Sequence, residues 1–231
     1  MARPPNQENR NGGNMSDPIR SYWELRLADT REALEANNFE AYVVENADEA
    51  RKLVLETIHP ALRPASVSFG GSGTIAACGL HDAYLNMEGV NVLDTWSQKL
   101  TWDEKYELRR QALLVDLFLM GTNAVTEDGY LVNLDMIGNR VAALTFGPRN
   151  VVVVAGRNKI VPDLESGMAR IKNFAAPVNT KRLNMKTPCV KTGRCMDCKS
   201  PERICNLWTI TEKSFPAARI KVVLVNEELG F

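Results

Sequence analysis

Four of the five cysteines in this 231-residue chain lie in one short polar segment. Their spacing is C-x5-C-x2-C-x6-C, and they are Cys189, Cys195, Cys198 and Cys205. Turn-forming, polar surroundings do not suit cysteines that only fill a core. Thiolates this close together repel one another unless a metal neutralises them, and four of them suit tetrahedral zinc or an iron–sulfur cluster. The segment therefore predicts a metal centre with these four ligands.

The spacing favours iron–sulfur over zinc. Structural zinc sites often use two C-x2-C pairs, and only one such pair is present. Iron–sulfur sites accept irregular spacing, and nearby basic residues would balance the negative charge of a cluster. Those basic residues are Lys191, Arg194, Lys199 and Arg203. We expect a [4Fe–4S] cluster, with zinc as the alternative. Free thiols, or a redox pair of Cys195 and Cys198, are the non-metal alternatives.

A glycine-rich turn is the second candidate site. It consists of Gly70, Gly71, Ser72, Gly73 and Thr74, and it joins a predicted strand to a predicted helix. Glycines let the backbone approach a ligand closely, and the hydroxyls and helix-start amides can hold a phosphate or carboxylate. The turn is neither G-x-G-x-x-G nor a P-loop. A tight turn with a capping serine is the structural alternative. We expect the turn to bind a small anion.

Residues 121–161 carry the third group of candidates. Five glycines divide this stretch, and residues 151–155 between them form an uninterrupted apolar run typical of a strand buried on both faces. Polar loops at the carboxyl ends of such strands usually hold the ligand. The residues expected to contact an anionic ligand are Asn123, Arg140, Asn158 and Lys159. Two pairs of these polar residues, Asn139-Arg140 and Asn158-Lys159, follow a glycine turn, and their structural alternative is helix capping.

Glu127 is the candidate catalytic residue. A carboxylate in a turn can act as a nucleophile, a general base or a ligand. The structural alternative is a β-hairpin whose turn is Asp128-Gly129, because apolar extended segments flank it on both sides.

The elements that must position these residues alternate between strand and helix. Strands are predicted at 39–44, 65–69, 90–93, 117–120 and 151–155, and helices at 21–38, 46–58, 75–85, 102–114 and 163–174. The helix at 46–58 is expected to end before Pro60. The alternation predicts an α/β fold with a mostly parallel sheet and helices on both faces. Two late strands, at about 207–212 and 220–225, are expected to be antiparallel and at an edge.

Composition divides the chain into a tail and one domain. Residues 1–20 contain few large apolar groups, so we expect a disordered extension. Residues 21–231 are long enough for a single α/β domain. Lys, Arg, Pro and Cys become dense at about 179–206, which predicts an insertion into that domain. Cys78 lies on an apolar helical stretch and is expected in the core.

Charge and hydropathy exclude several classes of function. Lys plus Arg and Asp plus Glu both number 28, so the net charge is zero, which argues against nucleic acid or an anionic membrane as the partner. No apolar run is long enough to span a membrane, and no signal peptide is evident. We therefore expect a cytoplasmic protein, whose cysteines stay reduced.

The central stretch, GTNAVTEDGYLVNLD followed by GNRVAALTFGPRNVVVVAGRNKIV, resembles the signature of LUD-domain, lactate-utilisation-type proteins. The FGGSGT turn is similar to the glycine-rich turn of the same family. The resemblance implies a three-layer α/β/α fold like that of CoA transferases and sugar-phosphate isomerases. Some relatives belong to an iron–sulfur-dependent system that oxidises L-lactate. The cysteine segment makes this chain similar to a stand-alone subgroup that has no established activity.

Two functions follow from these expectations. In the first, the protein is a redox-enzyme subunit related to lactate utilisation. It binds a small carboxylate or phosphorylated metabolite, carries a four-cysteine metal or iron–sulfur centre, and works with a redox partner protein. In the second, it is a non-catalytic ligand-binding or assembly module in which a zinc ion holds the insertion together.

Overall fold

The computed structural model describes residues 18–231. Residues 1–17 of the predicted extension therefore lie outside the described part. Helix α1 (Pro18–Ala36) begins at the first described residue, so residues 18–20, which were assigned to the extension, are helical.

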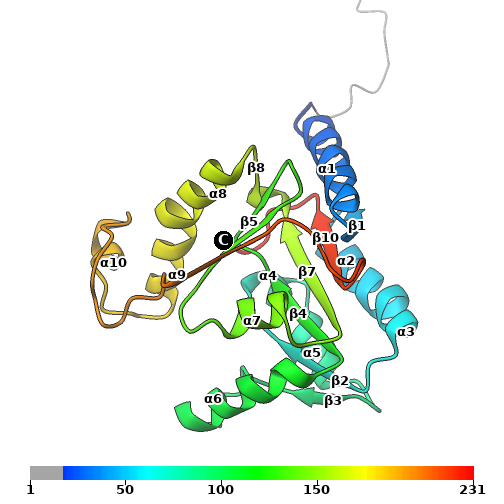
Figure 1. The fold of residues 1–231 in the computed structure, drawn as a ribbon, viewed down its shortest axis with the longest axis horizontal. Helices are drawn as coiled ribbons and strands as arrows, with labels where there is room; N and C mark the ends of the chain where they lie inside the picture. The colour runs from blue at the N-terminus through cyan, green and yellow to red at the C-terminus, as the bar shows by residue number, and fades with distance from the viewer. Residues whose placement is uncertain (1–17) are drawn as a thin grey trace, which may run out of the picture.

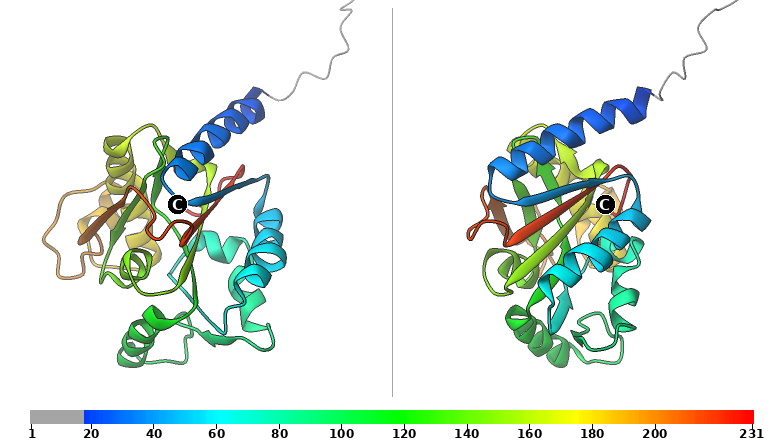
Figure 2. Two further views of the ribbon diagram at one scale, coloured as in Figure 1. Left: turned by 45° about the vertical axis from the view of Figure 1, so that its right-hand side comes forward. Right: turned by 90° about the vertical axis from the view of Figure 1, so that its right-hand side faces the viewer.

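The largest element is a six-stranded sheet in which every neighbouring pair is parallel (Figures 1 and 2). The prediction of an α/β fold with a mostly parallel sheet is confirmed. In spatial order its strands are β1 (Glu40–Val44), β10 (Ile220–Val225), β7 (Asn150–Gly156), β4 (Leu117–Gly121), β2 (Ser66–Phe69) and β3 (Asn91–Leu93).

Strand β7 lies inside this sheet and is buried on both faces, as its apolar run predicts. Val151 and Val153 pack into one hydrophobic cluster, whereas Val152 and Val154 pack into another. Successive side chains of a strand point to opposite faces, so the run supplies both layers of core. Each face then needs its own cover of helices.

Helices cover the two faces and complete a three-layer α/β/α arrangement. One face is packed by α2 (Ala47–Leu53), the π-helical turn η1 (Val54–Ile58), α3 (His59–Leu62), α4 (Gly73–Ala77) and α5 (Leu80–Leu85). The other is packed by α1, the 3₁₀ turn η2 (Ala112–Leu114) and α7 (Asn139–Thr145). Helix α6 (Trp102–Gln111) leads into η2.

A smaller, four-stranded sheet extends the second face. Its strands are β8 (Ile160–Val161), β5 (Ala124–Thr126), β6 (Leu131–Asp135) and β9 (Leu207–Thr211). Strands β5 and β6 form the predicted hairpin around Asp128-Gly129. A third hydrophobic cluster joins this sheet to α8 (Leu164–Arg170) and the π-helical turn η4 (Ile171–Ala175). The remaining short elements are η3 (Arg157–Lys159), α9 (Ala176–Arg182) and α10 (Pro188–Thr192).

Three predicted elements differ from the structure. Strand β10 is parallel and lies between β1 and β7, so its assignment as an antiparallel edge strand is wrong; β9 is antiparallel to β6 and ends the small sheet. The second helix does not end before Pro60 but continues to Leu62, because proline is tolerated in the first turn of α3. The helix at 75–85 is two helices, since Gly79 adopts a left-handed conformation at φ 62°.

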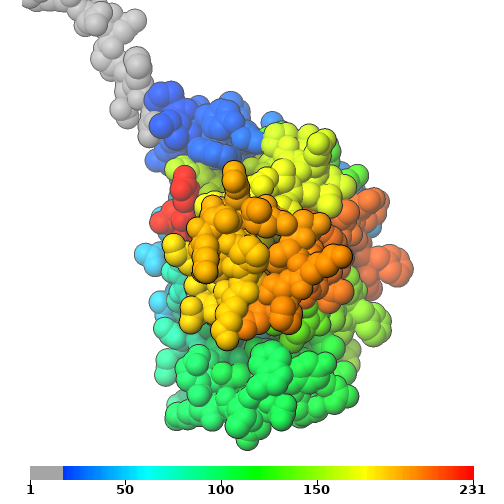
Figure 3. Space-filling model, turned by 90° about the vertical axis from the view of Figure 1, so that its left-hand side faces the viewer, coloured from blue at the N-terminus to red at the C-terminus, as the bar shows by residue number. Residues whose placement is uncertain are grey.

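The segment from α9 to β9 occupies the middle of one face of the molecule, coloured gold to orange in Figure 3. The predicted start of the cysteine-rich insertion, residue 179, lies inside α9. Within residues 18–231, no helix has both the length and the apolar character needed to cross a lipid bilayer.

Candidate functional site

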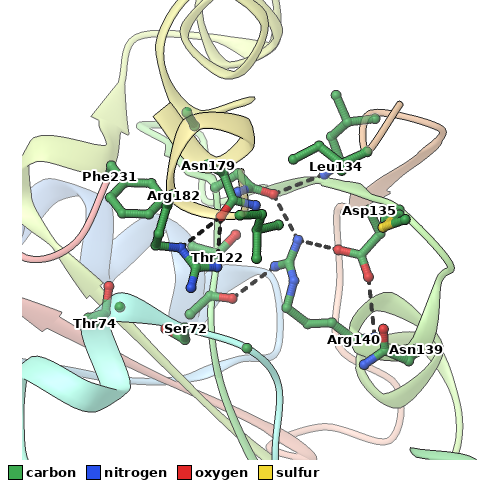
Figure 4. A pocket seen from close by; sticks show the side chains of 18 of the residues that line it. Ser72, Thr74, Thr122, Leu134, Asp135, Asn139, Arg140, Asn179, Arg182 and Phe231 are labelled. Carbon is green, nitrogen blue, oxygen red and sulfur yellow. Dashed lines mark hydrogen bonds and ion pairs between the residues drawn. The ribbon is translucent and has the colours of Figure 1, made fainter. Parts of the chain in front are cut away.

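The main pocket, a cavity of about 210 Å³, lies beyond the carboxyl ends of β2, β4 and β7, where polar loops were expected (Figure 4). The glycine-rich turn, the start of α7, the end of η3 and one side of α9 form its walls. The predicted residues that line it are Gly71, Ser72, Gly73, Thr74, Asn123, Arg140 and Lys159. Those that do not are Gly70, Glu127 and Asn158.

Arg140 is a buried organiser of the pocket. Its guanidinium donates to Asp135 Oδ1 at 2.5 Å, and it also reaches Asn133 Oδ1 at 2.5 Å. Further bonds run to the Gly121 carbonyl at 3.0 Å and to Asn123 Oδ1 at 2.8 Å. A buried guanidinium needs such partners. Most donors of Arg140 are therefore used to fix β4 and β6 against α7.

Lys159 is the most unusual group in the pocket. It is only 3% exposed, and its Nζ donates to Thr74 Oγ1 at 2.7 Å. Among residues 18–231, no carboxylate forms an ion pair with it. Burial lowers the pKa of Lys159 to about 7, and the positive charges of Arg170 and Arg140 act in the same direction. The amine therefore changes between its charged and neutral forms near neutral pH.

Two further arginines line the pocket with free hydrogen-bonding capacity. Arg182 donates through Nε and Nη2 to Asn179 Oδ1, at 3.0 and 2.8 Å, and its guanidinium lies over the Phe231 ring. Arg109 lies over the Trp102 ring, 5.3 Å from its centroid. Neither has a carboxylate within ion-pair distance in the part of the chain that the structure describes. Both can therefore receive an anion.

Sequence reasoning did not find Arg109 or Arg182. Both lie in the last turns of polar helices, where basic residues usually only complement the helix dipole. It also missed Asp135, although a signal existed, since an aspartate at the end of a strand precedes the Gly138 turn. Asp135 is the only acidic side chain among the described residues that line the pocket.

The glycine-rich turn positions the hydroxyls of the pocket. Ser72 caps α4 by accepting from the Ile75 amide at 3.2 Å, which confirms the capping alternative without removing Ser72 from the pocket wall. Close packing against Arg140 explains the glycine at position 70, because a Cβ there would lie 2.9 Å from Arg140 Cγ. Thr74 is buried and hydrogen-bonds the Leu229 carbonyl at 3.2 Å, which ties the turn to the end of the chain.

Two predicted residues lie outside the pocket. Asn158 holds the C-terminal residues, since its side chain accepts from the Leu229 amide and donates to the Gly230 carbonyl. Glu127 accepts from Arg26 Nε of α1 at 2.6 Å, which links the β5–β6 turn to that helix. A catalytic role for Glu127 stays a prediction.

The four loop cysteines line a second cavity, the cysteine pocket, and all are half-buried free thiols. Cys189 Sγ lies 3.3 Å from Thr180 Oγ1 and 3.2 Å from Thr187 Oγ1. Arg203 fixes the loop by donating to the carbonyls of Cys198 and Cys205, at 2.7 and 3.0 Å. Over the described residues, no three His, Cys, Asp or Glu side chains are drawn into a group that could hold a metal ion.

One wall separates the two pockets. Ile204 lines both of them, and it is buried. Helix α9 turns Thr180 toward the cysteine pocket, and Asn179 and Arg182 toward the main pocket. Helix α9 and Ile204 therefore contribute to both pockets.

The chain was compared with known proteins. No curated protein matches it. Among solved structures, it is similar to a DUF162 family protein from Deinococcus radiodurans, with 17% identity and a TM-score of 0.48 over 90% of this chain and 98% of that one. The family model of the LUD domain matches residues 27–225, which include both sheets, the cysteine pocket and every lining residue of the main pocket except Phe231. The chain belongs to the LUD-domain family.

Proposed function

We propose that the main pocket binds a small anionic metabolite, a carboxylate or a phosphorylated compound. The observation that carries the proposal is the charge of the side chains that line the pocket. They combine four cations with one acidic side chain, Asp135; the cations are Arg109, Arg140, Arg182 and Lys159. Asp135 is already paired with Arg140, so the other three cations have no acidic partner in the pocket. An anion would neutralise them and accept their hydrogen bonds.

The size of the cavity limits the ligand. Sites for drug-sized molecules usually enclose roughly 300–1,000 Å³. A cavity of about 210 Å³ suits a small acid or a small sugar phosphate.

Isothermal titration calorimetry with matched pairs of compounds tests the proposal. Lactate, pyruvate and glycerol 3-phosphate are the anionic probes, and lactamide and glycerol are their uncharged controls. We expect binding of at least one anion, weakened by salt, and none of the controls. Equal binding of lactate and lactamide, or no binding of any anion, would overturn the proposal.

We also propose that the cysteine loop carries a metal centre. Four free thiols around one cavity, fixed by Arg203 and bordered by Lys172, fit a set of thiolate ligands in chemistry and number. A [4Fe–4S] cluster is favoured and zinc is the alternative. A cluster would supply one-electron transfer, whereas zinc would supply folding energy to the loop.

The two pockets together favour a cytoplasmic redox-enzyme subunit related to lactate utilisation, which would exchange electrons with a partner protein. The alternative is a non-catalytic ligand-binding or assembly module with a structural zinc. The shared wall of α9 and Ile204 supports the first, because a centre in the loop would lie close to a ligand bound in the main pocket.

Metal analysis of anaerobically purified protein separates these proposals. Iron and sulfide with a visible charge-transfer spectrum would support the cluster, and stoichiometric zinc without colour would support the module. Replacing Cys195 and Cys198 with serine should abolish metal binding in either case. Cys78→Ser is the matched control, because Cys78 is buried in the main core. Absence of metal after reconstitution would overturn both versions.

A further inference from the structure

We propose that Lys159 is a nucleophile that forms an imine with a small carbonyl compound bearing a carboxylate or a phosphate. The inference rests on the proposed function, since the anionic group of that compound would be held by the pocket arginines. It adds a covalent step to what would otherwise be a binding site.

The surroundings of the Lys159 amine are those of an activated lysine. Its Nζ is buried and has one hydrogen-bond acceptor, Thr74 Oγ1. The positive charges that act on it are those of Arg170 and Arg140, and Cys78 has a smaller effect in the opposite direction. Desolvation and neighbouring cations favour the neutral amine, whose lone pair can attack a carbonyl carbon.

Lys221 shows that burial alone does not produce this state. It is 6% exposed, yet its Nζ forms an ion pair with Glu40 at 3.3 Å. It also donates to the Ala218 carbonyl at 2.7 Å and to Asn150 Oδ1 at 3.3 Å. Lys221 thus has a carboxylate partner, whereas the only hydrogen-bond partner of Lys159 Nζ in residues 18–231 is a hydroxyl. The chain therefore contains its own control for a buried lysine.

Two glycines let the backbone approach the amine closely, while Lys159 still lines the cavity. A Cβ at Gly121 would lie 3.6 Å from Lys159 Nζ, and a Cβ at Gly230 would lie 3.5 Å from it. Lys159 lines the same cavity as Arg182, whose guanidinium lies 5.8 Å from the centroid of the Phe231 ring. A bound anion at Arg182 can place a carbonyl in the space next to the amine.

The chemistry balances without an oxidant or reductant. The neutral amine adds to the carbonyl carbon, and the resulting carbinolamine takes up a proton from solvent and loses water to give a protonated imine. The imine withdraws electrons from the adjacent carbon, so that carbon can lose a proton and regain one from solvent. Hydrolysis then returns the carbonyl compound and the amine. Exchange of those carbon-bound protons with solvent is the activity that this site would support.

Borohydride trapping tests the inference on the wild-type protein. Pyruvate and dihydroxyacetone phosphate are the probes, which distinguish a carboxylate from a phosphate, and lactate and glycerol 3-phosphate are the matched alcohols. We expect a stoichiometric secondary-amine adduct with at least one probe and none with the alcohols. Peptide mass mapping should place it at Lys159 and leave Lys221 unmodified. The same probe should exchange protons in deuterated water.

Variants complete the experiment. Lys159→Arg keeps a positive charge but cannot form an imine, so it should lose both the adduct and the proton exchange. Calorimetric binding of a probe without any adduct, or adducts only at exposed lysines, would overturn the inference but leave the anion site intact. If no anion binds, the proposed function itself fails.

Discussion

Arg140 and Arg182 line the same pocket, but they differ in how many of their donors the protein already uses. Arg140 donates to four acceptors and pairs with Asp135, so it holds the walls in place. Arg182 bonds only Asn179 and keeps donors for a ligand. Loss of Arg140 would leave Asp135 as a buried, unpaired charge, which is strongly destabilising. Arg182 is therefore the better position for testing ligand binding.

Arg182→Ala should weaken anion binding about tenfold, which corresponds to ~1.4 kcal/mol. The effect is modest because Arg182 is an exposed guanidinium, and solvent screens its charge. Calorimetric titration of the tightest-binding anion measures it. Lys181→Ala is the control, since Lys181 precedes Arg182 on α9 but does not line the pocket. Equal losses of anion affinity in both variants would show that binding depends on the total positive charge at the end of α9 and not on Arg182 itself.

Anion affinity should also depend on pH through Lys159. The pKa of Lys159 is lowered from 10.5 to about 7, chiefly by burial and then by Arg170 and Arg140, against a smaller opposite effect of Cys78. The amine is charged below about pH 7 and neutral above it. Affinity should therefore fall as the pH rises through that value, and Lys159→Met should remove the dependence. An unchanged pH profile in the variant would contradict the assignment.

The same shift predicts how stability depends on pH. Between about pH 7 and 10.5 the unfolded chain binds a proton at Lys159 that the folded protein does not. The free energy of unfolding should therefore rise with pH over this window, and more steeply in the wild type than in Lys159→Met. Urea unfolding at several pH values measures it. Parallel curves for the two proteins would refute the shifted pKa.

At the scale of elements, the pocket depends on how closely strand ends approach the C-terminal residues. Gly156 ends β7, and a Cβ there would lie 2.5 Å from the Leu229 amide and 2.6 Å from the Glu227 carbonyl. Both are backbone atoms, which cannot rotate away as a side chain can. The absence of a side chain at Gly156 thus lets residues 227–229 reach Asn158 and Thr74.

Gly156→Ala should lower the free energy of unfolding by about 1–3 kcal/mol, the usual cost of overpacking. It should also weaken anion binding, because Leu229 and Thr74 would shift together. The midpoint of urea unfolding gives the first effect. Gly71→Ala is the control for stability, since a Cβ at Gly71 meets nothing within 4 Å. If Gly156→Ala were as stable as Gly71→Ala, residues 227–229 would have to move without cost to make room for the added methyl group.

At the scale of the molecule, α1 joins the two sheets. It packs on the large sheet through Leu27 and Leu34, and its Arg26 forms an ion pair with Glu127 of the small sheet's hairpin. Asn37, just after α1, donates to the Asp128 carbonyl at 2.8 Å. These contacts give Glu127 a structural role at some distance from the pocket lining.

Glu127→Gln should therefore reduce stability by less than about 1 kcal/mol, since the carboxylate is partly exposed and surface ion pairs contribute little. Anion affinity should not change. Thermal unfolding and calorimetric titration give the two results. Strong loss of binding or of proton exchange with unchanged stability would instead support the catalytic role that the sequence predicts for Glu127.

The sequence alone determined most of the local structure. The apolar run at residues 151–155 identified β7, and Asp128-Gly129 identified the hairpin, because strand burial and turn conformation depend on neighbouring residues. Residues 220–225, which are apolar except for Lys221, were also identified as a strand, but the place of this strand in the sheet was predicted wrongly. Parallel neighbours are joined by crossovers, so chain order does not give spatial order.

Only the tertiary structure decided which polar residues share a pocket. Arg109, Asp135, Lys159 and Arg182 come from four separate elements, and their convergence depends on the order of the strands and the docking of α9. The missing acidic partner of Lys159 is likewise a property of the packed molecule, because it depends on every segment that surrounds the amine. Spacing in the sequence was enough to predict that the four cysteines lie together, since they are close along the chain. It could not predict contacts between side chains that are far apart in the chain and meet only when the chain folds.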